Sequence, residues 1–238
     1  PKDATGYALV NVNGYSYYSP VENGDVIITI PGLGYGAYDV SVTYSGDGKY
    51  NSADKNFTIN IQKPILKSKN IQIRYTCKYP YRVLVTVDGN AVVKQYVIFK
   101  FNGKTYKRLT NNKGYATLKL PIVAPKTYKI TATFKGVSVS KNVKVGKIVV
   151  AYNKKIKKSA RFAKIKVRLA PVAKKYLAGK HMVLKLNGKT FKAITNKKGV
   201  ATFTISKKFL AMLKVGKVYK YKVRYAKDSV VRKITVLR

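Results

Sequence analysis

One stretch of the chain is repeated at a distance typical of a small domain. Residues 101–117 read FNGKTYKRLTNNKGYAT, and residues 186–202 read LNGKTFKAITNKKGVAT. At an offset of 85, residues 102–117 and 187–202 are identical at 11 of 16 positions. Identity this dense indicates a duplicated domain, and it constrains the fold more than any single motif does.

The repeated units have the alternation of β-strands. YDVSVTY, YKITATF and YKYKVRY each begin with Tyr and end with an aromatic residue on the same face. Val, Ile, Thr and the 20 Tyr also favour pleated sheet. For the second unit we predict strands near 70–77, 81–87, 96–102, 104–110, 115–120, 127–134 and 137–145. For the third we predict strands near 148–152, 163–169, 182–187, 189–195, 200–205, 218–226 and 229–237. Seven short strands separated by turns are typical of an immunoglobulin-type sandwich.

We therefore predict an all-β chain of tandem immunoglobulin-like β-sandwich domains at residues 1–62, 63–146 and 147–238. The first domain is expected to be incomplete at its N-terminus, because only about a dozen residues precede its Asn13-Gly14 turn. About forty residues precede the equivalent turn of the second domain. The missing strands would lie upstream of Pro1 or come from another chain. Since the chain begins with Pro, we expect it to be a piece of a longer protein.

Structural roles follow for several residues of the repeat. Tyr38, Tyr128 and Tyr219 open the late strands, where such sandwiches often place a core Tyr whose hydroxyl bonds nearby backbone. Short helical turns are expected in PVAKKYLAG, from Pro171 to Gly179, and in SKKFLAMLKVG, from Ser206 to Gly216.

Each copy contains Gly-Lys-Thr, the last three residues of a phosphate-binding P-loop. That loop needs another Gly five residues earlier and a helix afterwards. Here Ile98 and Val183 stand at the earlier positions, and strand patterns lie on both sides. Asn-Gly between alternating segments instead predicts two-residue hairpin turns at Gly103 and Gly188.

The composition argues against catalysis and metal binding. Residues 63–238 contain two carboxylates, one His and one Cys, too few for a clustered acid-base or metal site. His181 is predicted to be a surface residue at a strand end, and Cys77 a small buried apolar residue of a strand. Asp47 and Asp54 in SGDGKYNSAD lack the spacing of a calcium loop and fit a turn. We expect no enzyme activity, no cofactor and no metal.

Charge is the property that points to a partner. Residues 1–62 hold three Lys and six acids, a net charge of −3. The rest of the chain holds 46 basic residues and two acids, Asp88 and Asp228. An excess of this size implies anionic partners. Basic residues alternate with apolar ones on the predicted strands, so they face solvent. The candidate polyanion-binding residues are Lys104, Lys107, Arg108, Lys189, Lys192, Lys220, Lys222 and Arg224.

The quoted segments resemble a known family. NGKTYKRLTNNKGYATLKLP, NGKTFKAITNKKGVATFTI and GAYDVSVTYSGDGKYNSADKNFTINI are similar to immunoglobulin-like repeats of adhesin-like surface proteins from methanogenic archaea, and to bacterial repeats of that type. The resemblance implies an extracellular, cell-surface stalk or adhesive protein whose partners are other cells or surface proteins. It implies no catalytic residues.

The sequence leaves three functions open. The first is a surface adhesin module whose basic domains attach to an anionic cell-wall or surface polysaccharide. The second is a nucleic-acid-binding protein, which charge and Tyr content favour but which lacks the aromatic-glycine motif of RNA-recognition sheets and a DNA-reading helix. The third is a passive spacer whose charge serves solubility. No segment has the length and hydropathy of a membrane span.

Overall fold

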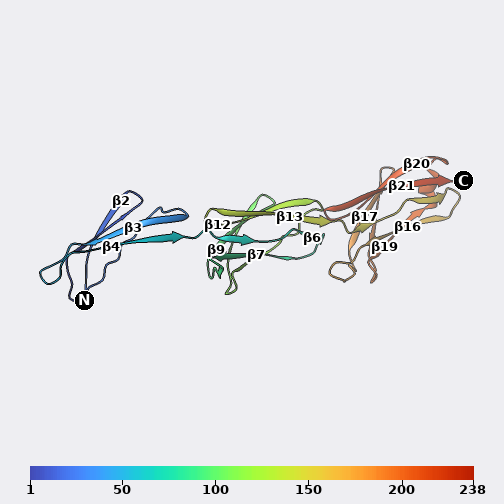
Figure 1. Cartoon of the computed structure of the whole chain (residues 1–238). Coiled ribbons are helices and arrows are strands. Elements are labelled where there is room, and N and C mark those ends of the chain that lie inside the picture. The colour runs from blue at the N-terminus through green and yellow to red at the C-terminus, as the bar shows by residue number, and fades with distance from the viewer. The chain divides into compact units, whose positions relative to one another are not determined.

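The computed structural model describes residues 1–238 and is built almost entirely of β-strands (Figure 1). The only helix, α1 (Lys207–Ala211), has five residues. The structure has no helix with the length and apolar character needed to cross a membrane. The chain divides into two compact units, Pro1–Ile65 with Val85–Val92 and Leu66–Leu84 with Val93–Arg238. The predicted all-β class is confirmed.

The first unit contains one antiparallel sheet in the order β2-β1-β3-β4. Its strands are β1 (Tyr7–Val12), β2 (Tyr15–Pro20), β3 (Gly36–Tyr44) and β4 (Ala53–Ile61). Asn13 and Gly14 connect β1 to β2 with φ angles of 52° and 75°, as a two-residue turn requires.

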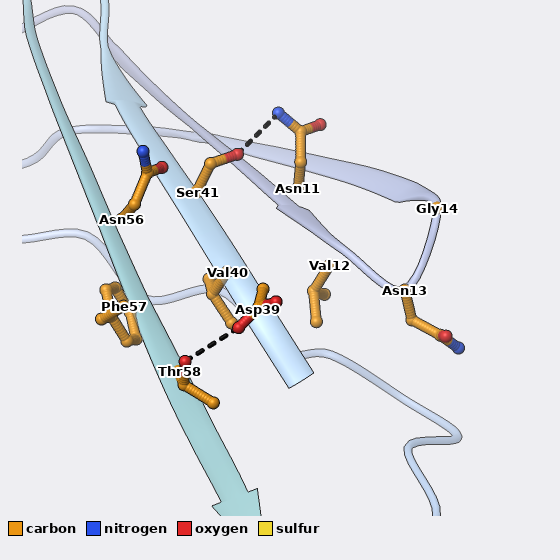
Figure 2. Close-up of a pocket in the computed structure, with 10 residues that line it drawn as sticks. All are labelled: Asn11, Val12, Asn13, Gly14, Asp39, Val40, Ser41, Asn56, Phe57 and Thr58. Atoms are coloured by element: carbon orange, nitrogen blue, oxygen red, sulfur yellow. Dashed lines mark hydrogen bonds between the residues drawn. The ribbon is translucent and has the colours of Figure 1, made fainter. Parts of the chain in front are cut away.

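The two faces of this sheet differ in chemistry because side chains alternate along each strand. Val10, Val12 and Val40 form a small buried cluster on one face, against which Ile28, Ile30 and Leu33 pack from the segment before β3. Asn11 and Ser41 lie on the opposite face (Figure 2). The unit therefore buries one apolar face and leaves a polar face in solvent.

Residues 65–146 form a pair of sheets. One has the order β10-β9-β12-β13-β6, and the other has the order β11-β7-β5 with β8 paired to β7. The strands are β5 (Ile65–Lys67), β6 (Ile71–Arg74), β7 (Pro80–Val87), β8 (Asn90–Ala91), β9 (Tyr96–Phe101), β10 (Lys104–Leu109), β11 (Tyr115–Lys119), β12 (Thr127–Phe134) and β13 (Val137–Gly146). Inward residues such as Phe99, Phe101 and Ile130 are fully buried.

A further pair of sheets follows in the chain. Its sheets have the orders β14-β16-β19 and β15-β21-β20-β17-β18. The strands are β14 (Val149–Val150), β15 (Lys154–Lys157), β16 (Phe162–Leu169), β17 (His181–Leu186), β18 (Lys189–Ile194), β19 (Val200–Ser206), β20 (Val218–Tyr225) and β21 (Asp228–Leu237). The core includes Leu184, Phe203 and Tyr221, each at most 1% exposed.

The two pairs of sheets share one strand order. Strands β5, β7 and β11 match β14, β16 and β19, and the sheet from β10 to β6 matches the sheet from β18 to β15. In both, the short strand β6 or β15 runs parallel to the last strand. This arrangement is an immunoglobulin-type sandwich, as predicted. The order β2-β1-β3-β4 matches only β10-β9-β12-β13, so the first unit provides one sheet of such a sandwich. The domain boundaries at 62/63 and 146/147 stay predictions.

The three tyrosines that open late strands have different surroundings. The Tyr128 hydroxyl donates to the Ala124 carbonyl oxygen at 2.8 Å, and its ring centroid lies 5.5 Å from that of Phe101. The Tyr219 hydroxyl instead accepts a hydrogen bond from the backbone N–H of Lys214 at 3.0 Å. Tyr38 packs beside the small cluster of the first unit.

Two other tyrosines, for which no role was predicted, hydrogen-bond from a strand to the backbone of a preceding loop. The Tyr81 hydroxyl donates to the Lys69 carbonyl at 3.2 Å, and the Tyr221 hydroxyl donates to the Tyr152 carbonyl at 2.6 Å. Burial raises the pKa of both phenols. Each hydroxyl therefore fixes the segment that precedes its sandwich's first long strand.

One of the two expected helical turns is absent. Helix α1 forms where predicted, with the Ser206 hydroxyl accepting from the Phe209 N–H. It ends at Ala211, with Met212 as its C-cap, and does not continue to Gly216. The prediction from Pro171 to Gly179 was wrong. Val172 and Lys175 form a two-way backbone bridge there, with Ala173 and Lys174 at φ angles of 48° and 63°. Those angles make a tight left-handed turn and exclude a helix.

Candidate functional site

Strand β20 carries a column of three cations on the outer face of the last sandwich. Lys220, Lys222 and Arg224 are exposed, and they alternate with the buried Tyr221 and Val223. Residues two apart on a strand lie roughly 7 Å apart, so the column presents evenly spaced positive charges.

The neighbouring strands extend this column into a basic surface. The pairing of β17, β18, β21 and β15 with β20 or with one another places further exposed cations on the same side. We call this surface the basic face. Its cations are Lys155, Lys157, Lys185, Lys192, Lys220, Lys222, Arg224 and Lys233.

Like charges are directly opposite one another on the basic face. Lys185 pairs in register with Lys222, and Lys220 pairs with Lys233. Side chains so paired have Cβ atoms roughly 5 Å apart, and like charges at that distance destabilise a sheet. No carboxylate compensates them, because Asp228, the acid in these strands, is buried and points inward with its partner Tyr225. A bound anion would remove this repulsion.

A shallow hollow lies on this face at the β17–β18 turn. It has a volume of about 460 Å³, and its lining includes Lys185, Lys220 and Lys222. Asn187 and Gly188, at φ angles of 44° and 75°, form the turn at its edge. The hollow therefore places three ammonium groups around one recess of the size of a small ligand site.

The predicted basic residues of the last sandwich fall on both sides of its sheet. Lys192, Lys220, Lys222 and Arg224 lie on the basic face. Lys189 pairs with the buried Leu186 and so lies on the other side of β18, with its Nζ 5.9 Å from the Phe209 ring centroid.

The predicted basic residues of the preceding sandwich are also divided. Lys107 lies on the outer face, with its Nζ 4.2 Å from the Tyr96 ring centroid. Lys104 and Arg108 pair with the buried Phe101 and Val97, on the other side of β10. One strand cannot present consecutive residues 107 and 108 on the same face, so this cluster does not form a single surface.

Four cations of the basic face were not among the predicted site residues. Lys185 and Lys233 alternate with buried residues in HMVLKL and RKITV, a pattern visible in the sequence. Lys155 and Lys157 belong to β15, a strand that was not predicted, because KKIK contains a single apolar residue. Their position becomes clear only from the parallel pairing with β21.

The Gly-Lys-Thr motifs form hairpins in the structure. Asn102 and Gly103 have φ angles of 49° and 74°, and Lys104 pairs with Phe101 across the turn. The Lys and Thr of each motif begin a strand, β10 or β18, so no helix N-terminus is present to hold a phosphate.

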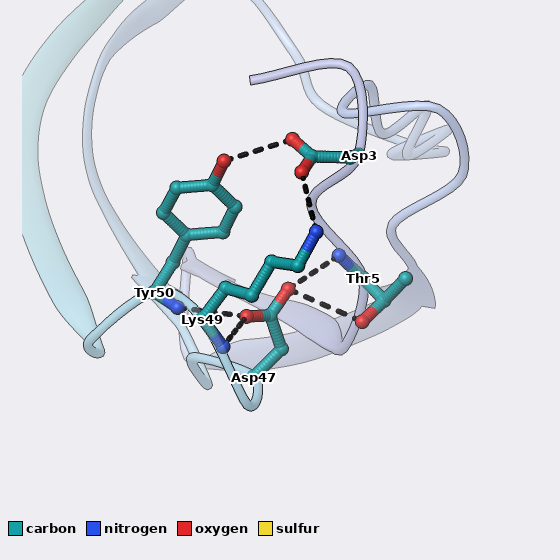
Figure 3. A network of polar contacts seen from close by, with 5 residues as sticks. All are labelled: Asp3, Thr5, Asp47, Lys49 and Tyr50. Atoms are coloured by element: carbon teal, nitrogen blue, oxygen red, sulfur yellow. Dashed lines mark hydrogen bonds and ion pairs between the residues drawn. The ribbon is translucent and has the colours of Figure 1, made fainter.

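The acidic loop of the first unit organises its own backbone (Figure 3). The Asp47 carboxylate accepts hydrogen bonds from the backbone N–H groups of Thr5, Lys49 and Tyr50 at 2.7, 2.7 and 2.8 Å. Asp3 accepts from the Tyr50 hydroxyl and pairs with Lys49 at 3.0 Å. The bonds from backbone N–H groups, led by that of Thr5, hold the pKa of Asp47 well below its usual range.

No group of three or more His, Cys, Asp or Glu is placed to hold a metal ion. His181 is exposed at the start of β17, on the basic face opposite Ile194. Cys77 differs from its prediction, because β6 ends at Arg74 and the half-buried thiol lies in the turn that follows. Thr76 in that turn has a φ angle of 70°, which a strand cannot accommodate.

No protein-family model and no curated protein matches the chain. The chain is similar to a 1.5-MDa bacterial ice-binding adhesin, with 14% identity over 98% of this chain and 86% of the other and a TM-score of 0.28. It is also similar to the I9–I11 tandem of titin, with 11% identity over 99% of this chain and 94% of the other and a TM-score of 0.44. For the D0–D1 domain of intimin the identity is 15% over 74% of this chain and 98% of the other, with a TM-score of 0.31. Similarities of this degree carry no argument about function, and the fold assignment rests on the strand order described above.

Proposed function

We propose that this chain is a non-enzymatic module of a cell-surface adhesin or stalk, whose last sandwich attaches to an anionic cell-wall or extracellular polymer. The observation that carries the proposal is the basic face, where eight cations gather on one sheet and two pairs of lysines oppose each other in register. Tandem sandwiches without clustered catalytic groups suit a binding and spacing role. The sequence resemblance to surface adhesins supports an extracellular location, with other cells or surface proteins as further partners.

Electrostatics favour a polymer over a single small anion. In water, two unit charges 4 Å apart interact by about 1 kcal/mol, so each contact with an exposed lysine is weak. The face spans five strands, and a polymer can contact many of its cations at once. Several weak contacts on one chain then add to a stable attachment, because later contacts form at high effective concentration.

The basic face favours a polysaccharide over a nucleic acid. Proteins that bind single-stranded nucleic acid combine cations with aromatic side chains that stack on bases. The outward positions of β17, β18, β20 and β21 hold Val183, Ile194, Val218, Val231 and Leu237 between the cations, and no Tyr or Phe. The face therefore offers charge without a stacking platform.

The test compares two triple variants that remove the same charge. Lys220→Gln/Lys222→Gln/Arg224→Gln neutralises the column of β20. Lys164→Gln/Lys166→Gln/Arg168→Gln neutralises an identical Lys-x-Lys-x-Arg column on β16, whose side chains are also exposed but belong to the smaller sheet. Both variants retain every buried core residue.

Each protein is incubated with purified cell-wall material and with heparin, a defined anionic polysaccharide, at increasing salt. We expect wild type and the β16 variant to bind at low salt and to dissociate as salt rises, while the β20 variant binds weakly throughout. Equal loss in the two variants would contradict a specific face. Absence of binding at low salt would leave the spacer interpretation, and a clear preference for DNA over heparin of equal charge would favour the nucleic-acid interpretation.

A further inference from the structure

The polar face of the first unit carries a row of hydrogen-bonding side chains across all four strands. Asn11 of β1 lies opposite Ser16 of β2 and Ser41 of β3, and Ser41 lies opposite Asn56 of β4. Asp39 and Thr58 form a second pair beside this row. Figure 2 shows Asn11 beside Ser41 and Asp39 beside Thr58. Strand alternation places these side chains on the face opposite the buried Val12 and Val40.

Hydrogen bonds within the row fix several of its side chains. The Ser16 hydroxyl donates to Asn11 Oδ1, and Asn11 Nδ2 donates to Ser41 Oγ at 3.3 Å. The Thr58 hydroxyl donates to Asp39 Oδ1 at 2.8 Å. The Asn56 amide lies beside Ser41 without a hydrogen-bond partner (Figure 2). The row is therefore partly ordered before any ligand arrives, and one amide remains available as both donor and acceptor.

Asn11, Ser41 and Asn56 of this row line a shallow recess together with Asp39 and Thr58. The recess has a volume of about 480 Å³, which is within the range of small-molecule sites. Tyr18 stands on the same face, two residues along β2 from Ser16, and its side chain is 78% exposed. Leu9 pairs with Tyr18 and is also exposed. A polar row next to an exposed aromatic ring presents hydrogen-bonding groups and an apolar surface side by side.

The charge of this face is the reverse of that of the basic face. The recess contains a carboxylate, Asp39, and no cation among its lining residues. Residues 1–62 carry a net charge of −3. An anionic polymer is therefore repelled here, and a single carboxylate without a cluster of other ligands does not make a metal site. The other polar groups of the recess are amides and hydroxyls, which suit an uncharged ligand with many hydroxyl groups.

We propose that this recess is a second binding site, which takes a neutral oligosaccharide. Sugar hydroxyls both donate and accept, and they match the amides of Asn11 and Asn56 and the oxygens of Ser41 and Asp39. Tyr18 lies outside the recess, beyond the pair of Asn11 and Ser16, so an oligosaccharide that extends past Asn11 would pack the apolar C–H face of one ring on it. This site is independent of the basic face and differs from it in its response to salt.

The experiment uses the full chain, labelled with ¹⁵N, and titrates it with maltotetraose, cellotetraose and mannotetraose to millimolar concentration. At least one of these probes is expected to shift the backbone resonances of residues 9–13, 39–43 and 54–58, with an affinity that does not change with salt. Asn56→Ala weakens that binding about tenfold, as loss of one or two hydrogen bonds predicts.

The matched control is Asn60→Ala, since Asn60 is also an exposed asparagine on the same face of β4 but lies outside the recess. The control is expected to bind like wild type. The proposal is overturned if no probe shifts these resonances, if the shifts lie elsewhere in the chain, or if the two variants bind equally. A negative oligosaccharide titration would not bear on heparin binding by the basic face. A negative heparin experiment would likewise not bear on oligosaccharide binding at this recess.

Discussion

Asp228 is the residue whose removal should damage the last sandwich most specifically. Its carboxylate is 1% exposed, and its Oδ2 accepts hydrogen bonds from the backbone N–H groups of Ile148 and Val149 at 2.6 and 2.8 Å. Ile148 immediately precedes β14, the first strand of the sandwich, and Val149 is the first residue of that strand. Asp228→Ala leaves both buried N–H groups without an acceptor.

The loss of stability expected for Asp228→Ala follows from these two hydrogen bonds. A hydrogen bond to a charged group contributes about 1.5–3 kcal/mol, so losing both should lower the free energy of unfolding by roughly 3–6 kcal/mol. A domain has about 5–15 kcal/mol in total, so this loss is a large fraction of its stability. Asp228→Asn keeps one side-chain oxygen as an acceptor and should lose roughly 1–2 kcal/mol.

Hydrogen exchange measured by NMR is the appropriate assay, because it reports each amide separately in a chain with several domains. We expect exchange of the Ile148 and Val149 amides to accelerate about a hundredfold or more in Asp228→Ala. Asp88→Asn, which removes the other carboxylate of residues 63–238 at an exposed turn, is the control and should leave these amides unchanged. Unaltered exchange in Asp228→Ala would refute the argument that these bonds hold β14.

Three further predictions concern single residues. Tyr128→Phe removes the hydrogen bond from the hydroxyl to the Ala124 carbonyl oxygen and should lower the free energy of unfolding by about 1 kcal/mol. Denaturant titration followed by tyrosine fluorescence measures this change. No change would mean that this hydrogen bond does not stabilise the fold. Gly188→Ala places a Cβ at a φ of 75°, where no neighbouring atom obstructs it. The backbone strain alone should therefore lower the free energy of unfolding by about 1–2 kcal/mol in the same assay. An unchanged free energy of unfolding would contradict the turn geometry. The pKa of Asp47 is lowered in the folded state, so its contribution to stability is present above the unfolded pKa near 3.8 and is lost as pH falls through the folded pKa. Asp47→Asn should therefore reduce the acid dependence of amide exchange in the first unit, and an acid dependence equal to that of wild type would contradict this role.

The sandwiches could be predicted from the sequence repeat because turns and strand alternation depend on residues that are adjacent in the chain. Asn-Gly turns need positive φ at two positions, and alternation places Lys220 and Lys222 outside while Tyr221 lies inside. These features are properties of neighbouring residues, so a single sequence contains them.

Pairing across strands could not be derived in the same way. The opposition of Lys185 and Lys222 depends on the register between β17 and β20, which are more than thirty residues apart in the chain. Lys104 and Lys107 were grouped by proximity in sequence, yet the register of β10 places them on opposite sides. Strand β15 exists because β21 provides parallel backbone partners for KKIK, not because of its own composition.

Two loops differ from their predictions because their conformation also depends on residues elsewhere in the fold. Pro171 is compatible with the first turn of a helix, but the backbone bridge between Val172 and Lys175 satisfies the same polar groups in a tighter turn. Tyr219 occupies the position equivalent to Tyr128, yet helix α1 lengthens the connection before it, and its hydroxyl accepts from Lys214. The turn conformation and the partner of the Tyr219 hydroxyl therefore depend on tertiary structure and not on the local sequence alone.

The most direct test of the basic face is the salt dependence of its affinity for heparin. Each cation in contact with a polyanion contributes about 0.7–0.9 to the slope of log affinity against log salt, the value known for nucleic acids. Lys220→Gln/Lys222→Gln/Arg224→Gln should therefore lower the slope by about 2–3. Lys164→Gln/Lys166→Gln/Arg168→Gln should leave the slope at the wild-type value. Equal slopes for the two variants would show that the charge acts only as a whole and would contradict a binding face on β20.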